Sequence, residues 1–175
     1  VVERLIGHKG PVHCLQASWE DQLAISCSSD HCMRVWHLER NQPDLLLEGH
    51  GSPIGCLEVS WSPRRVLSGS CDGSVFVWNA QDGSVSGKLF GHTSAVSGVS
   101  ADWSSLRALS ASLDRTLRIW NMDDSTCSYR LEGHTGPIRC IEVDWTLSFV
   151  VSGSDDQSLR VWDLQTYEIV DEVRG

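Results

Sequence analysis

Short runs of apolar residues, each bounded by turn-forming residues, follow one another along the whole chain. The first three runs are Val12–Ser18, Leu23–Ser28 and Met33–Leu38. Residues 41–44 (NQPD) then supply turn chemistry before a fourth run, Leu45–Leu47. Strands this short, at regular spacing and separated by turn residues, are typical of an all-β protein. We expect the later strands at Ile54–Val59, Val66–Ser70, Ser74–Trp78, Val85–Phe90, Val96–Ala101, Ala108–Ser112, Thr116–Trp120, Cys127–Leu131, Ile138–Val143, Phe149–Ser154, Ser158–Leu164 and Glu168–Val173.

The same pattern returns every 42 residues, four times, without an insertion or a deletion. Each copy has a Gly-His pair, then a Ser, an Asp and a Trp at fixed positions. A constant period of about 40–45 residues with Gly-His and Trp anchors indicates the blades of a β-propeller. The four sets are His8, Ser26, Asp30 and Trp36; His50, Ser68, Asp72 and Trp78; His92, Ser110, Asp114 and Trp120; and His134, Ser152, Asp156 and Trp162.

These motifs resemble those of the WD-repeat family, and the resemblance covers the whole chain. Only Trp162-Asp163 has the literal Trp-Asp pair, and the other copies have His37, Asn79 and Asn121 after the Trp. The resemblance implies one four-stranded antiparallel blade per repeat, a central channel, protein binding and no catalysis. The expected fold class is therefore all-β, an arc of four WD-type propeller blades. The expected units are 1–7 as the last strand of a preceding blade, then 8–49, 50–91, 92–133 and 134–175 as blades.

Both ends of the chain fall inside the repeat. Residues 1–6 resemble the segment before each later Gly-His, and Gly175 stands where a fifth Gly-His would begin. The family usually has seven or eight blades, so we expect further blades from a longer chain. The alternative is a second copy that completes an eight-bladed ring, which leaves one surplus strand in each chain.

Composition narrows the choice of partners. The net charge is −9, and the 14 basic residues are spread singly along the chain. An acidic chain without a basic stripe argues against nucleic acid as a partner. No apolar run approaches the ~18 residues of a membrane span, so we expect no membrane insertion.

The cysteines indicate reduced, structural thiols. Their number, seven, is odd, and the chain has no CxxC motif. Cys14, Cys56 and Cys140 share one position of the repeat with Gly98, so we expect a small, buried site there. Cys27 shares a second such position with two glycines and an alanine. Reduced cysteines fit an intracellular, cytoplasmic protein.

The repeated Ser, His and Asp have the residue types of a hydrolase triad. An enzyme needs one such site, whereas four identical copies at a fixed phase indicate architecture. The chain also lacks the GxSxG nucleophile elbow. In the WD-repeat family these residues form a hydrogen-bond chain from the Trp N–H through Ser and His to Asp. We therefore expect structural tetrads, no enzymatic activity and no cofactor.

Three further histidines, His13, His31 and His37, lie outside the Gly-His series. They fall at three different phases of the first repeat, and no two have the spacing of a known zinc motif. We expect no metal site.

A second tryptophan series, Trp19, Trp61, Trp103 and Trp145, has the same 42-residue period. These residues fall in the turn after the first strand of each blade. One interpretation is an exposed aromatic rim that binds a partner. The favoured interpretation is that each Trp folds over its hairpin and packs on a neighbouring blade.

The resemblance implies that partners dock on the face with the Gly-His loops. Hot spots favour Trp, Tyr and Arg, and only Arg139 on this face qualifies. We expect Arg139 and Asp155 of the fourth copy to carry specificity, with His13 as a lesser contributor. The expected function is a non-enzymatic scaffold that binds other proteins and mediates assembly of a multiprotein complex. The alternative is a purely structural subunit, fixed in a large assembly without an exchangeable partner. The residues placed on this face are Pro11, His13, Ser29, Pro53, Gly55, Cys71, Ala95, Ser97, Leu113, Pro137, Arg139 and Asp155.

Overall fold

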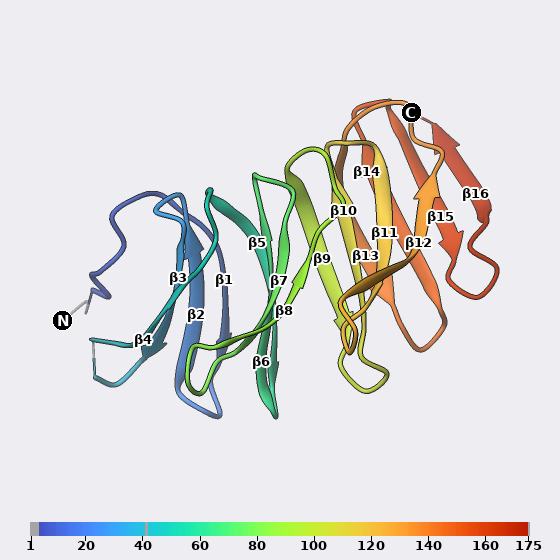
Figure 1. The fold of residues 1–175 in the computed structure, drawn as a ribbon. Coiled ribbons are helices and arrows are strands. Elements are labelled where there is room, and N and C mark those ends of the chain that lie inside the picture. Colours follow the sequence, from blue (N-terminus) through green and yellow to red (C-terminus); the bar gives the residue numbers. More distant parts are fainter. Residues whose placement is uncertain (1–3, 41, 175) are drawn as a thin grey trace.

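A computed structural model describes residues 4–40 and 42–174, and these residues form four separate four-stranded sheets (Figure 1). In every sheet, strands that are consecutive in the chain pair antiparallel. The all-β arc of four four-stranded blades expected from the sequence is confirmed. Blade 1 holds β1 (Val12–Ser18), β2 (Leu23–Ser28), β3 (Cys32–His37) and β4 (Gln42–Glu48); blade 2 holds β5 (Ile54–Trp61), β6 (Arg64–Ser70), β7 (Val75–Asn79) and β8 (Val85–Leu89); blade 3 holds β9 (Val96–Asp102), β10 (Arg107–Ser112), β11 (Thr116–Asn121) and β12 (Thr126–Glu132); blade 4 holds β13 (Ile138–Asp144), β14 (Phe149–Ser154), β15 (Ser158–Asp163) and β16 (Ile169–Arg174).

The blades stack side by side in chain order, so the two ends of the chain lie at opposite ends of the arc (Figure 1). The first strands β1, β5, β9 and β13 contact one another in sequence, which places them along the inner edge of the arc. Each Gly-His pair precedes one of these inner strands. The loops with the tetrads therefore lie at equivalent places around the arc.

Three hydrophobic cores hold the arc together, and each of them lies between two blades. In the first core, Ile25 and Leu47 of blade 1 pack with Ile54 and Trp78 of blade 2, and all four are almost fully buried. The second core joins blades 2 and 3, and the third joins blades 3 and 4. Because one sheet cannot bury both of its faces, every blade depends on its neighbours for stability.

The outer faces of blades 1 and 4 keep apolar side chains in solvent, whereas the same repeat positions are buried elsewhere. Leu15 is 61% exposed, and its equivalent in blade 2, Leu57, is 5% exposed. Cys140 is exposed, so the expectation of a buried site at this position is wrong for blade 4. The residues around it would be covered by a following blade. The exposed apolar residues on the two outer faces include Val12, Leu15, Trp19, Val151, Leu159 and Val173.

The strand boundaries differ slightly from those expected from the sequence. The expected Leu45–Leu47 runs from Gln42 to Glu48 in the structure. Of the segment expected as an outer strand, residues 1–3 lie outside the described residues, and residues 4–6 are not in a strand. A strand forms only against a partner, and an outer strand there would pair with a preceding blade. The blade boundaries drawn from the sequence stay a prediction.

Candidate functional site

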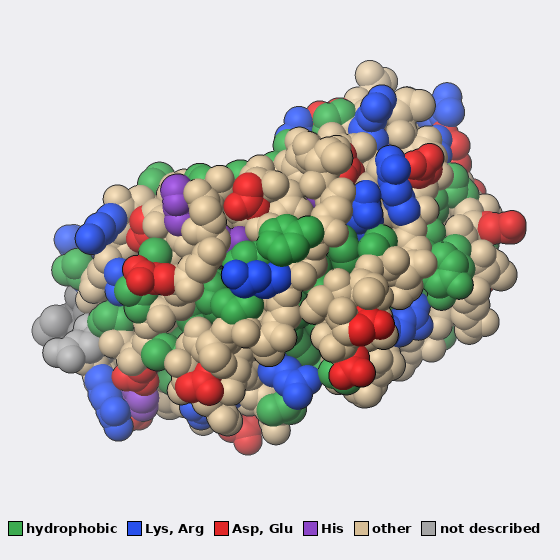
Figure 2. Space-filling view, viewed as in Figure 1, with side chains coloured by type: hydrophobic (Ala, Val, Ile, Leu, Met, Phe, Trp, Pro, Cys, Tyr) green, Lys and Arg blue, Asp and Glu red, His purple; other side chains and the backbone are tan. Residues whose placement is uncertain are grey.

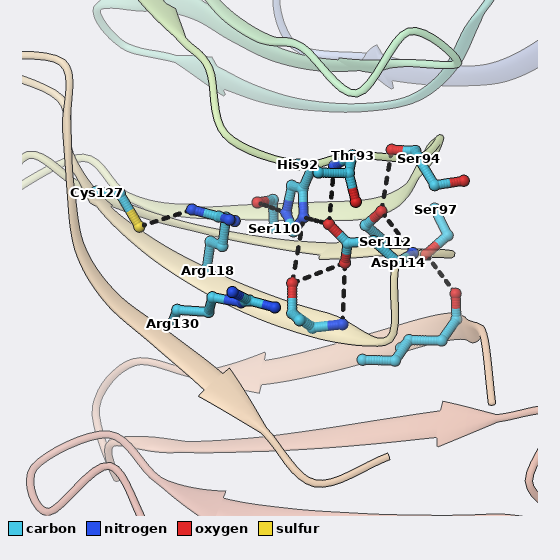
Figure 3. A network of polar contacts seen from close by, with 12 residues as sticks. His92, Thr93, Ser94, Ser97, Ser110, Ser112, Asp114, Arg118, Cys127 and Arg130 are labelled. Atoms are coloured by element: carbon cyan, nitrogen blue, oxygen red, sulfur yellow. Dashed lines mark hydrogen bonds and ion pairs between the residues drawn. The ribbon is translucent and has the colours of Figure 1, made fainter. Parts of the chain in front are cut away.

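A chain of hydrogen bonds in blade 3 joins Trp120, Ser110, His92 and Asp114. Figure 3 shows its Ser110, His92 and Asp114 part. The Trp120 indole N–H donates to Ser110 Oγ at 2.8 Å, and this oxygen lies 2.7 Å from His92 Nε2. His92 Nδ1 lies 2.8 Å from Asp114 Oδ2. Since the indole is only a donor, the serine hydroxyl donates to Nε2, and Nδ1–H donates to the carboxylate. The network ties the loop before β9 to β10, to the β10–β11 turn and to β11.

Blades 1 and 4 repeat this geometry. The His8 and His134 Nδ1 atoms each lie 2.8 Å from the carboxylates of Asp30 and Asp156. In blade 1, Ser26 Oγ lies 2.7 Å from both His8 Nε2 and Trp36 Nε1. In blade 4, Ser152 Oγ lies 2.7 Å from His134 Nε2 and 2.8 Å from Trp162 Nε1.

The tetrad carboxylates are held in their ionised form. Burial by itself raises the pKa of Asp30, but hydrogen bonds from the Lys9 backbone N–H and from His8 outweigh burial and lower the pKa to about 2. The same balance lowers the pKa of Asp114 and of Asp156 well below the ordinary aspartate range. Each carboxylate therefore acts as a fixed acceptor that orients its histidine.

Blade 2 has the same four residue types but a different connection. His50 Nδ1 lies 3.0 Å from Ser74 Oγ, and the Ser74 hydroxyl donates to Asp72 Oδ1 at 2.5 Å. A direct His50–Asp72 hydrogen bond, which the repeat pattern favours, is replaced by this relay through Ser74. The Phe76 ring stacks on the imidazole of His50, with ring centroids 4.1 Å apart.

Blade 2 differs from the other three blades at the repeat position two residues before the tetrad Trp, where it has Phe76 and they have an arginine. Desolvation by burial lowers the pKa of His50 to about 4, so the imidazole is neutral at pH 7. A neutral imidazole needs no charged partner, and a serine hydroxyl can satisfy its Nδ1–H. The equivalent arginines are Arg34, Arg118 and Arg160.

The tetrad serines are placed for structure and not for nucleophilic attack. Ser68, Ser110 and Ser152 are fully buried, and Ser26 is 6% exposed. Each hydroxyl oxygen accepts a hydrogen bond from an indole and contacts a histidine. A nucleophilic serine needs its oxygen free to reach a substrate. The four serines therefore act as fixed links between strands.

The structure adds a second serine series that the sequence reasoning did not single out. Ser28, two residues after Ser26, donates to the backbone carbonyl of Gly10 and accepts from the backbone N–H of Asp30. This serine fixes the turn that presents the tetrad carboxylate. Its constant spacing from the tetrad serine was the available signal. The equivalent residues are Ser70, Ser112 and Ser154.

The glycine of each Gly-His pair is required by close packing. A Cβ atom at Gly49 would lie 3.1 Å from the Trp78 ring. At Gly133 a Cβ would meet the Trp162 ring at 3.1 Å and the Arg160 guanidinium at a still shorter distance. The tetrad Trp therefore packs edge-on against the backbone that carries the tetrad His. The recurrence of Gly before His was visible in the sequence, but its reason was not.

The second tryptophan series is mostly buried between blades. Trp61, Trp103 and Trp145 pack against the core shared with the preceding blade. The Trp145 indole N–H donates to Ser100 Oγ of blade 3 at 3.0 Å. Trp19 belongs to the first blade of the arc, and 76% of its surface is exposed. The packing interpretation therefore describes three of the four tryptophans.

On the face with the Gly-His loops, Arg139 and Asp155 form an exposed two-pronged ion pair. Arg139 Nε lies 2.9 Å from Asp155 Oδ1, and Arg139 Nη2 lies 2.6 Å from Asp155 Oδ2. The hydrogen bond from Arg139 lowers the pKa of Asp155, and the same contact raises the pKa of Arg139. In blade 1 the equivalent pair is His13 and Ser29, whose Nε2 and Oγ atoms lie 2.6 Å apart.

The other two blades have no charged group at these positions. Blade 2 has Gly55 and Cys71 there, and blade 3 has Ser97 and Leu113. Ser97 turns its hydroxyl toward blade 4 and donates to the Ile138 carbonyl at 2.7 Å. In every blade the two loops are joined by a backbone hydrogen bond, such as Asp155 N–H to Pro137 O at 2.9 Å. Blades 1 and 4 therefore carry the polar side chains on an otherwise uniform loop framework.

Charged groups of both signs are interspersed on the side of the molecule shown in Figure 2, and apolar side chains lie between them. Within residues 4–40 and 42–174, no group of three His, Cys, Asp or Glu side chains is placed to hold a metal ion. The described part of the chain also contains no helix that is long and apolar enough to cross a membrane.

The family model of the WD domain, G-beta repeat (WD40), matches the chain four times, at residues 1–37, 41–79, 83–121 and 125–163. No curated protein matches the chain. The second match begins just before β4 of blade 1 and ends at β7 of blade 2, so one family repeat contributes to two neighbouring sheets. The four matches cover most of the chain, and the four-bladed arc agrees with them. The chain therefore belongs to the WD40 repeat family.

Proposed function

We propose that this chain is a non-catalytic interaction scaffold whose partner docks on the Gly-His loop face at blade 4. WD40 repeats generally mediate protein–protein interaction or complex assembly. The observation that carries the proposal is the Arg139–Asp155 pair. Its side chains remain 56% and 43% exposed although they are joined by short hydrogen bonds.

The pair is suited to recognition because it is already ordered. A guanidinium that is held by one carboxylate keeps its remaining N–H donors and its planar face available for a partner. Ordering long side chains before binding reduces the entropy lost on association. An exposed ion pair adds little to folding stability, so a role in binding accounts for it better than a role in stability.

His13 extends the proposed surface to blade 1. It is exposed and hydrogen-bonded to Ser29 at the position that corresponds to Arg139. Blades 2 and 3 offer small or apolar side chains at this position, so they would serve as spacers between the two polar ends. A partner that contacts both ends would span the arc along its Gly-His loops.

The test uses charge reversal. Full-length wild-type protein captures partners from a lysate of its source, and the captured proteins are quantified. The R139D/D155R double variant keeps an ion pair but exchanges its two ends, so the fold should persist while at least one captured partner falls by tenfold or more. R130A is the matched control, because Arg130 forms an exposed pair with Glu132 on the outer strand β12.

The alternative is a structural subunit that is fixed in a large assembly. In that case the wild-type protein purifies with partners in fixed stoichiometry, and neither the R139D/D155R variant nor the R130A control changes the amount of these partners. An equal loss with R130A and with the double variant would also reject blade 4 as the docking site. A W19A variant tests whether the exposed tryptophan is the docking site instead. If W19A loses a partner and R139D/D155R does not, the partner docks on the opposite rim.

A further inference from the structure

Two cysteines face each other across the first two strands of blade 1. The register of β1 and β2 pairs Cys14 directly with Cys27. Residues directly opposite each other in antiparallel strands have their Cβ atoms about 4.5–5.5 Å apart and on the same face. Both thiols are free, with Cys27 fully buried and Cys14 partly exposed.

The other blades show how close two sulfur atoms at these positions must come. In blade 2 the equivalent pair is Cys56 and Gly69, and a Cβ atom at Gly69 would lie 2.6 Å from the Cys56 Sγ atom. In blade 4 a Cβ at Gly153 would lie 2.8 Å from Cys140 Sγ. In a disulfide, each Sγ lies about 3 Å from the Cβ of its partner. The repeat geometry therefore places these two positions at the separation that a disulfide requires.

Blade 1 is the only blade with sulfur at both positions. Blade 3 has Gly98 opposite Ala111, and blades 2 and 4 keep a glycine opposite their cysteine. The Cys27 thiol beside it lowers the pKa of Cys14, whereas the Cys14 thiol and burial raise the pKa of Cys27. Cys14 is therefore the more reactive thiol, because the thiolate is the nucleophile.

We propose that Cys14 and Cys27 form an oxidative modification site, which a hydroperoxide converts into a disulfide between β1 and β2. The Cys14 thiolate attacks one oxygen of hydrogen peroxide, the O–O bond breaks, and a sulfenic acid and hydroxide result. The hydroxide takes up the proton that the Cys14 thiol had released and leaves as water. The Cys27 sulfur then attacks the Cys14 sulfur and releases hydroxide, which takes the Cys27 proton and leaves as water. Two thiols lose two electrons and two protons, and one equivalent of hydroperoxide is reduced.

The placement of the pair favours a stable product over further oxidation. Cys27 lies in the core between blades 1 and 2, so it is shielded from solvent oxidant. It can act as the resolving thiol as soon as Cys14 is oxidised. A nearby resolving cysteine diverts a sulfenic acid to a disulfide before it reaches the irreversible sulfinic state.

The experiment treats the folded full-length chain with one to five equivalents of hydrogen peroxide, then alkylates the remaining thiols and maps linked peptides by mass spectrometry. The expected result is a Cys14–Cys27 cross-linked peptide and two fewer titratable thiols per chain. C14S should abolish the cross-link and keep its remaining thiols reduced. C56S is the matched control, because Cys56 has the same position in the repeat but faces glycine, and it should form the cross-link as wild type does.

C27A serves as a second variant. The core position should tolerate alanine, since blade 3 has the buried Ala111 at the equivalent position. It should retain the fold by circular dichroism, and its Cys14 should become trapped as a sulfenic acid that reacts with dimedone. Alkylation of Cys14 at full stoichiometry after peroxide treatment of the wild type would overturn the proposal. A cross-link that joins Cys14 to a different cysteine would overturn it too.

Discussion

Blades 2 and 3 have the same tetrad residue types, and each has a blade packed on both of its faces, yet their histidines are held differently. His92 contacts the Asp114 carboxylate directly, whereas His50 contacts Ser74, which in turn contacts Asp72. The Trp–Ser–His part of the two tetrads is alike, because in both blades the serine bridges the indole N–H and the imidazole Nε2. The difference lies in the contact at Nδ1 and in the carboxylate, since Asp114 also accepts the backbone N–H of Thr93.

The side chain beside the imidazole accounts for this difference. Arg118 in blade 3 lies over the Trp120 ring at 5.8 Å, while Phe76 in blade 2 stacks on His50 itself. Burial lowers the pKa of His50, so its imidazole is neutral and a hydroxyl suffices as acceptor. Equal residues at equal repeat positions thus need not make equal contacts, because a neighbour outside the motif decides the geometry.

The largest effect is expected from substitution of the tetrad serine, whose contacts are the same in the two blades. S68A and S110A should destabilise the protein to the same extent, because each leaves a buried indole N–H and a buried imidazole Nε2 without a partner. Each unsatisfied group costs about 1–3 kcal/mol. Urea unfolding measures both losses, and S128A on the exposed outer strand β12 is the control that should change little. A difference above about 1 kcal/mol between the two variants would contradict the equivalence.

The next effect separates the two blades. D114A should cost about 1–3 kcal/mol, because His92 Nδ1 keeps only the Thr116 hydroxyl at 3.4 Å and the Thr93 backbone N–H loses its acceptor. D72A should cost less, since His50 keeps the Ser74 hydroxyl. Both aspartates also accept the backbone N–H two residues later, so that contribution cancels in the comparison. The two unfolding midpoints in urea decide the matter, and a larger loss for D72A would show that the relay through Ser74 is not independent of the carboxylate.

The smallest effect is a pH dependence that comes from His50. Its pKa is about 4 in the folded chain against 6.5 for a free histidine, so the unfolded chain binds a proton first as the pH falls. Stability should therefore decrease by about 1–2 kcal/mol between pH 7.5 and 5, and the contribution is complete near pH 4. H50Q should flatten this slope. Parallel slopes for wild type and H50Q in urea unfolding would refute the assignment.

The fold followed from the sequence because its signals are repeated. Four equally spaced Gly-His, Ser, Asp and Trp sets make the sheet count and the order of strands visible without any structure. The residues brought together in each tetrad were also visible, since the 42-residue period groups them. What could not be read was the His50 relay, because His50, Ser68 and Asp72 are the same letters as in the other copies.

Exposure was equally beyond the sequence. Trp19 and Trp61 occupy the same repeat position, but within the described residues Trp61 packs on blade 1 and no blade covers Trp19. Cys56 and Cys140 also share a position, and among the described residues a further blade packs beside Cys56 but not beside Cys140. Periodicity specifies what a residue is next to within its own blade, while burial depends on a neighbouring blade. The polar pair Arg139 and Asp155 could be placed on its face by position, but its preformed hydrogen bonds could not.

The tryptophans between blades all pack toward the N-terminal side of the arc. Trp61, Trp103 and Trp145 each pack on the blade that comes earlier in the chain. A ribosome releases the chain from its N-terminus, so the surface that each tryptophan needs has already emerged when the tryptophan itself appears. Each new blade can therefore dock on a finished one during synthesis. A nascent chain of this kind never has to wait for a later blade in order to bury these three large side chains.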